Sequence, residues 1–172
     1  MITKKNMLLC LLVFCFYSCS TNKTIDKNIS APNPKANNIK EIIENNNKVI
    51  LRDQWGVPHV YGTTDSDAAY SLAYAHAQDD FKTIKEALLK ARGTYASVYG
   101  PGKDNINAIM DYVVSLLKIW DSINEKYHNE LSPETIDLCE GYANGLNAYI
   151  EDHGLIEDDI YPISGKDIIA GT

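Results

Sequence analysis

The sequence lacks an excess of positive charge. Its 172 residues include 16 basic and 23 acidic side chains, which gives a formal net charge of -7. Because nucleic acid is densely negative, a protein that binds it normally presents a basic surface. The charge balance therefore argues against a nucleic-acid partner, and we expect none.

The sequence also lacks a hydrophobic run long enough to cross a bilayer. Its main apolar stretch, residues 7–17, is well short of the roughly 20 residues that a spanning helix requires. The stretch follows Lys4 and Lys5, and a short basic segment before a short apolar one is typical of a signal peptide. We therefore expect residues 1–18 to be a signal peptide that directs export.

Cysteine is scarce, and each cysteine has a separate interpretation. The four are Cys10, Cys15, Cys19 and Cys139. The first two fall in the signal peptide, whereas Cys19 follows a small residue directly after the apolar stretch and resembles the anchor cysteine of a bacterial lipobox. A multiply acylated cysteine would hold the chain stably on a membrane. We expect Cys19 to carry a lipid anchor in the cell envelope, in the periplasm or at the outer membrane, with plain secretion as the alternative.

Cys139 has no partner left for a disulfide within the mature chain. It lies on the apolar stripe of a predicted helix, which favours a buried and inert thiol. A catalytic role is the alternative, but no helix N-terminus or basic neighbour is present in the local sequence to lower the thiol pKa.

The chain divides into a tether and one folded part. Residues 19–47 are rich in Asn, Lys, Ser and Pro and lack apolar periodicity, so burial cannot offset their ordering entropy. We expect them to form a flexible, lipid-anchored tether. The folded part, residues 48–172, opens with a strand over 49–52, a type I turn over 53–56 and a second strand over 57–61.

Four helical segments should follow. The first is capped by Thr64 or Asp65, has an alanine-rich half that allows close packing, and ends at Gly93. The second spans 106–123, the third opens at Ser132 and ends before Gly154, and the last begins at Gly165. A lone hairpin and one final turn of helix are marginal by themselves. We therefore expect the domain to be incomplete in this chain.

Several blocks occur in an order that resembles the penicillin acylase family. They are R-D-Q-W-G-V-P-H at 52–59, A-Q-D-D-F at 77–81, R-G at 92–93, L-S-P-E at 131–134, G-Y-A-N-G-L-N-A-Y-I at 141–150 and G-K-D-I at 165–168. The versions at 57–59 and 79–81 look closer to acylases of acyl-homoserine lactones and cyclic lipopeptides than to penicillin G acylases. The resemblance is strong because the blocks keep their order and rough spacing over residues 48–172.

The resemblance implies an α+β fold: the mostly helical α-subunit portion of an αββα N-terminal-nucleophile hydrolase. In that family one precursor is cut into α and β subunits, and the new N-terminal serine of β attacks the amide of an N-acylated small molecule. Processing commonly exposes a serine after glycine, and this sequence has no Gly-Ser pair. The resemblance therefore implies a β-subunit partner, an inactive chain without it, no catalytic, cofactor-binding or metal residue here, and possible calcium in the complete enzyme.

Other candidate sites have weaker support. His76, Asp79 and Asp80 share a helix face that could offer metal ligands, but a packed His76 at a helix-to-strand contact is favoured. His59 is expected to be structural. Gly100–Gly102 is expected to form a corner rather than a phosphate loop, because the lysine that follows it is not succeeded by Ser or Thr. The acidic run 157–159 is expected to be a solvated loop.

Two further alternatives remain open at this point. Arg52 and Asp53 could join the α and β parts by ion pairing. The chain could also be a non-enzymatic surface lipoprotein that binds acylated ligands, or a truncated, non-functional product.

Overall fold

The computed structural model describes residues 47–156 and 158–171. The predicted signal peptide, Cys19 and nearly all of the predicted tether lie outside these residues. Within the described part, no helix is both long and apolar enough to span a bilayer.

The fold opens with an antiparallel hairpin of β1 (Lys48–Arg52) and β2 (Pro58–Gly62), in the register Lys48 opposite Gly62. The Gly56 N–H donates to the Asp53 carbonyl oxygen at 3.0 Å, which closes the predicted turn. The Asp53 carboxylate also accepts from the backbone N–H groups of Trp55 and Val57, each at 2.9 Å. Pro58 begins its strand, as predicted for a residue without an N–H.

Helix α3 (Asp65–Arg92) begins where the sequence predicts, because Thr64 and Asp67 form a reciprocal capping box. It bends at Asp80, which has φ -156° and ψ 70° and which the periodicity did not predict. The Asp80 carboxylate accepts from the Thr83 N–H at 3.1 Å and from its hydroxyl at 2.6 Å. Asp80 therefore acts as an internal N-cap for the second half of the helix.

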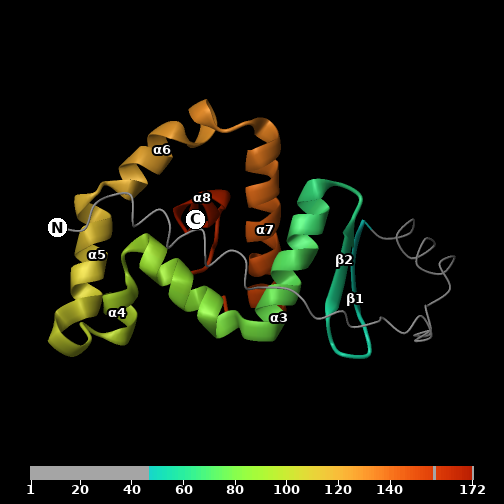
Figure 1. The fold of residues 1–172 in the computed structure, drawn as a ribbon, viewed down its shortest axis with the longest axis horizontal. Helices are drawn as coiled ribbons and strands as arrows, with labels where there is room; N and C mark the ends of the chain where they lie inside the picture. The colour runs from blue at the N-terminus through green and yellow to red at the C-terminus, as the bar shows by residue number, and fades with distance from the viewer. Residues whose placement is uncertain (1–46, 157, 172) are drawn as a thin grey trace, which may run out of the picture. The chain divides into compact units, whose positions relative to one another are not determined.

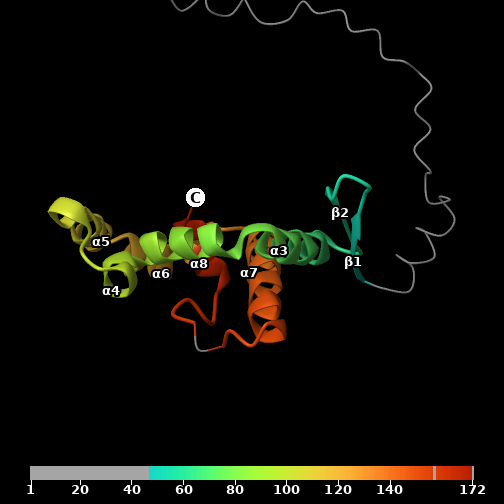
Figure 2. The same cartoon turned by 90° about the horizontal axis from the view of Figure 1, so that it is seen from below.

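Helix α7 (Pro133–Asp152) crosses the first half of α3 at close range, and the two lie against each other in both views of the ribbon (Figures 1 and 2). Gly141 and Gly145 face the backbone of Ser66 and Tyr70, so the absence of a side chain permits this approach. The core that forms around the contact consists of Ala73, Ala77, Leu88, Leu89, Ala143, Leu146, Ile150, Ile160 and Ile163. The predicted close packing against the alanine-rich half of α3 is confirmed.

The segment between α3 and α7 differs from the prediction. It contains α4 (Tyr95–Tyr99), the short 3-10 helix η2 (Lys103–Asn105), α5 (Ile106–Leu116) and α6 (Ile119–Glu130). The single helix predicted over 106–123 is wrong, because Lys118 adopts φ +52° and separates α5 from α6. Helix α8 (Gly165–Ala170) then packs against α7, α6 and α3.

Candidate functional site

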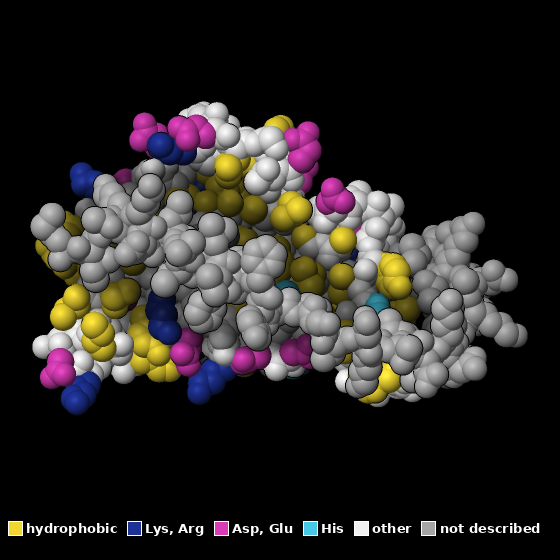
Figure 3. Space-filling view, in the orientation of Figure 1, with side chains coloured by type: hydrophobic (Ala, Val, Ile, Leu, Met, Phe, Trp, Pro, Cys, Tyr) yellow, Lys and Arg dark blue, Asp and Glu magenta, His cyan; other side chains and the backbone are white. Residues whose placement is uncertain are grey.

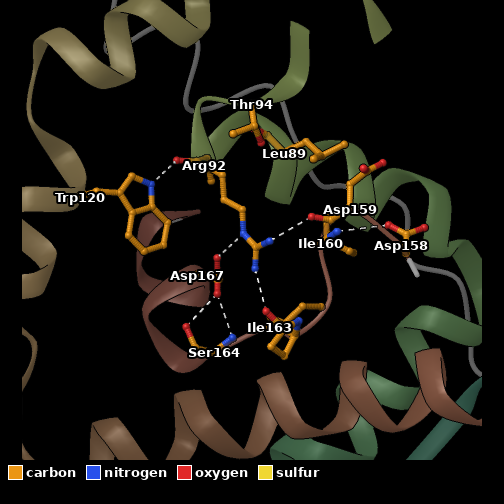
Figure 4. A network of polar contacts seen from close by, with 12 residues as sticks. Leu89, Arg92, Thr94, Trp120, Asp158, Asp159, Ile160, Ile163, Ser164 and Asp167 are labelled. Carbon is orange, nitrogen blue, oxygen red and sulfur yellow. Dashed lines mark hydrogen bonds and ion pairs between the residues drawn. The ribbon is translucent and has the colours of Figure 1, made fainter. Parts of the chain in front are cut away.

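The main polar cluster of the described part is centred on Arg92, at the end of α3 (Figure 4). Its Nε donates to the Asp167 carboxylate of α8 at 2.6 Å. Its two terminal nitrogens donate to the carbonyl oxygens of Pro162, at 3.0 Å, and Asp159, at 3.4 Å. One guanidinium therefore ties the end of α3 to three points of the segment that leads into and forms α8.

Asp167 is only 4% exposed, and each of its oxygens has a partner. One oxygen accepts from Arg92, and the other accepts from the Ser164 N–H and hydroxyl, both at 2.8 Å. Burial by itself would raise the pKa of this carboxyl group. The hydrogen bonds from Arg92 and Ser164 outweigh it and hold the pKa of Asp167 below its usual value.

A shallow hollow of about 350 Å³ lies beside this ion pair and is lined by Arg92, Trp120 and Asp167. The Trp120 indole N–H donates to the Ala91 carbonyl oxygen at 3.1 Å, so its polar edge is also occupied. Within the described residues, no buried side-chain nitrogen or oxygen lacks a hydrogen-bond partner. The cluster thus has the properties of a structural clamp between α3, α6 and α8 rather than of a reaction centre.

The structure does not bring the suspected metal ligands together. His76 Nδ1 lies 2.9 Å from the Tyr142 hydroxyl, Asp79 pairs with Arg52 at 2.8 Å, and Asp80 caps its own helix. Among the described residues, no group of three or more His, Cys, Asp or Glu side chains could hold a metal ion. The expected helix-to-strand contact of His76 is wrong, because its partner Tyr142 lies on α7.

Arg52 and Asp53 both have partners within this chain. Besides Asp79, Arg52 donates to the Gly56 carbonyl oxygen at 2.9 Å. Asp53 caps its turn, and its carboxylate lies 3.5 Å from Nε2 of the half-exposed His59, whose predicted structural role stays a prediction. These contacts explain the charged pair without a second subunit.

The acidic run is only partly described, because Glu157 lies outside the described residues. Lys85 of α3 approaches Asp158 to 2.8 Å and Asp159 to 3.7 Å. The Asp158 side chain is only 13% exposed, so the expectation of a fully solvated loop is wrong for this residue. Lys85, which is 73 residues from Asp158 in sequence, replaces water as the partner of its carboxylate.

Cys139 is 4% exposed on α7, and burial raises the pKa of its thiol. A thiol held in its neutral form is a poor nucleophile, which agrees with the predicted inert role.

Gly100 and Gly102 form the predicted corner, and the Asn107 amide donates to the Gly100 carbonyl oxygen at 3.0 Å.

The side of α5 that faces solvent is apolar, which the sequence did not predict. The apolar stripe of the 106–117 region was predicted, but its direction was not. Figure 3 shows hydrophobic side chains gathered over the corner formed by α4 and α5. Six large side chains of this region are exposed: Ile106, Ile109, Met110, Tyr112, Leu116 and Leu117. We call them the α5 face.

Residues 48–164 match the family model described as penicillin amidase, and this chain belongs to that family. It is 32% identical over 102 residues to penicillin G acylase of Escherichia coli, and 33% identical over 104 residues to the acyl-homoserine lactone acylase QuiP of Pseudomonas aeruginosa. The matched parts are 59% and 60% of this chain, but only 12% of either relative.

A solved structure agrees with the sequence match. The chain resembles a thermostable penicillin G acylase from Alcaligenes faecalis with a TM-score of 0.62 and 29% identity, over 72% of this chain and 69% of that one. The predicted mostly helical α+β fold of the penicillin acylase family is therefore confirmed. The predicted lean toward acyl-homoserine-lactone acylases rather than penicillin G acylases stays a prediction, since relatives of both names match at similar identity.

Proposed function

We propose that this chain is the α-subunit portion of an acylase that hydrolyses the amide bond of N-acylated small molecules. The family match over residues 48–164 is the observation that carries the proposal. Relatives named for action on penicillin G and on acyl-homoserine lactones support an N-acyl substrate. The described residues supply no activated nucleophile, so the role we assign to them is scaffolding.

The fraction of each relative that this chain covers supports an enzyme made of two chains cut from one precursor. This chain accounts for 12% of the E. coli relative, yet for 69% of the solved A. faecalis chain. Cleavage of a long precursor would produce a short mature chain. This accounts for a solved chain of similar length to this one beside much longer curated relatives. Another relative, from a Pseudomonas species, is named penicillin acylase 2 proenzyme, which also indicates a precursor.

In the proposed enzyme the reacting groups lie on the partner. The β part supplies the N-terminal serine that attacks the acyl carbonyl, and its own amine takes the proton. Backbone or amide donors of that part stabilise the oxyanion, and the C–N bond breaks as the amine leaves with the proton. Water then hydrolyses the acyl-serine ester, which releases the carboxylic acid and restores the serine. We assign any calcium to the complete enzyme rather than to this chain. The proposed lipid at Cys19 would anchor the enzyme in the cell envelope.

The test uses the gene product from its own cells. It is captured with an antibody against this chain, after which co-purified polypeptides are sequenced from their N-termini and amine release is measured. The substrates are an N-phenylacetyl amine and an N-acyl-homoserine lactone. We expect a larger polypeptide that begins with serine, and amine release that a Ser→Ala change at that position abolishes.

Two outcomes would overturn the proposal. A chain that purifies alone and binds acylated ligands without cleaving them would be a ligand-binding lipoprotein. A chain that purifies alone, aggregates and binds nothing would be a non-functional product.

A further inference from the structure

Helix α5 is amphipathic, but its apolar side points away from the rest of the described fold. Its exposed residues recur at spacings of three and four, which places Ile106, Ile109, Met110 and Leu116 along one side of the helix. Between 50% and 60% of each of these four side chains is accessible to solvent. A stripe of this kind normally faces a core, so an outward stripe indicates a missing neighbour.

The opposite side of α5 makes specific contacts that hold the helix in place. The Asp111 carboxylate accepts from the backbone N–H groups of Tyr95 and Ala96 on α4, at 3.1 and 2.7 Å. Asn107 binds the Gly100 carbonyl oxygen, and Val114 lies against Gly93. The inward side thus contributes two polar side chains and Val114, and these contacts fix the direction in which the α5 face points.

We propose that the α5 face is the surface on which the remaining polypeptide of the acylase docks, through an apolar and uncharged patch of its own. This inference rests on the proposed function. The family provides a long polypeptide to occupy this surface, because the matched 102 residues make up only 12% of the E. coli relative. A protein partner also fits the composition, since protein interfaces that form permanently are apolar and enriched in methionine and aromatic residues.

A membrane surface fits the same face less well. Helices that lie on membranes usually carry lysine and arginine along their polar side. The charged residue within α5 is Asp111, which is engaged with α4, and the net charge of the whole chain is -7. Anionic lipid would therefore be repelled rather than attracted.

The experiment compares Ile109→Glu with Leu138→Glu in the protein expressed from its complete gene. Ile109 is 50% exposed on the α5 face, and Leu138 is 45% exposed on α7, so the control introduces the same charge at similar exposure elsewhere. We expect Ile109→Glu to weaken recovery of the acylase partner about tenfold or more, as for a central interface residue. Leu138→Glu should leave recovery within about twofold of the wild type.

A second measurement separates docking from misfolding. A photo-crosslinking amino acid is placed at Met110 or, as the control, at Leu138, and the cross-linked products are identified by mass spectrometry. The proposal expects a cross-link from position 110 to the larger acylase polypeptide. Cross-links from 110 to lipid only or to a second copy of this chain would overturn it, as would equal partner recovery by both glutamate variants.

The outcomes also separate this inference from the proposed function. If the wild-type chain recovers no acylase polypeptide, the proposed function fails and this inference fails with it. If the wild-type chain recovers an active partner and Ile109→Glu does so equally well, only the docking surface is wrong.

Discussion

Arg92 and Asp167 are 75 residues apart in sequence, yet the guanidinium Nε and a carboxylate oxygen lie 2.6 Å apart. The pair joins the last turn of α3 to the first turn of α8, where an acidic residue also suits the helix dipole. Because Asp167 is almost fully buried, its charge depends on this partner. The ion pair and its hydrogen bonds therefore help to hold α8 in place, together with the packing of α8 against α7, α6 and α3.

Arg92→Met should destabilise the fold strongly, because it leaves the buried Asp167 carboxylate without its cation. We expect a loss of about 3 kcal/mol in the free energy of unfolding, the lower end of the range for breaking a buried pair. Urea denaturation followed by circular dichroism measures it. The control is Lys126→Met, which removes an exposed pair with Glu130 and should cost less than about 1 kcal/mol. Equal losses in the two variants would refute the clamp.

Asp167 should also contribute to the acid sensitivity of the fold. Its folded-state pKa is lowered, so its stabilising effect is complete above the unfolded pKa and disappears as the pH falls through the folded pKa. Asp167→Asn should therefore be less stable than the wild type at neutral pH, and the difference should shrink below about pH 4. Urea midpoints measured across this range test it, and a difference that stays constant down to acid pH would contradict the assignment.

Features decided by neighbouring residues could be predicted from the sequence. The turn that starts at Asp53, the cap of α3 at Thr64 and the cap of α7 at Ser132 all appear as expected. Each depends on hydrogen bonds within four residues, so the local sequence contains the whole interaction.

Features decided by distant residues could not be predicted. Periodicity identified the apolar stripe of α5 but not its direction, which depends on the contacts of Asp111 with α4. The break at Lys118 also has no signal in the periodicity, because the apolar pattern continues into α6. Arg92 and Asp167 were both noted in family motifs, but spacing alone does not pair residues so far apart.

Gly145→Ala tests the close contact of α7 with α3. A Cβ at this position would clash with the Tyr70 carbonyl oxygen and the Ala73 methyl group, so the helices would have to separate. We expect a cost of about 1–3 kcal/mol or more in the free energy of unfolding, as for an overpacked core. Gly171→Ala is the control, because its nearest neighbour would be 3.6 Å away, and thermal denaturation compares the two. A Gly145 variant as stable as the control would show that the helices can move apart freely.

Asp111→Ala tests whether α5 is positioned by capping a neighbouring helix. Thr94, the N-cap residue of α4, provides no side-chain hydrogen bond to the helix, and the Asp111 carboxylate binds the N–H groups of Tyr95 and Ala96 instead. Loss of a cap typically costs about 1 kcal/mol, so hydrogen exchange at these two amides should accelerate about fivefold. Asp111→Asn retains one acceptor oxygen and should give an intermediate rate. Exchange rates that match the wild type in both variants would mean that α4 is held by its packing alone, and that the outward direction of the α5 face has another cause.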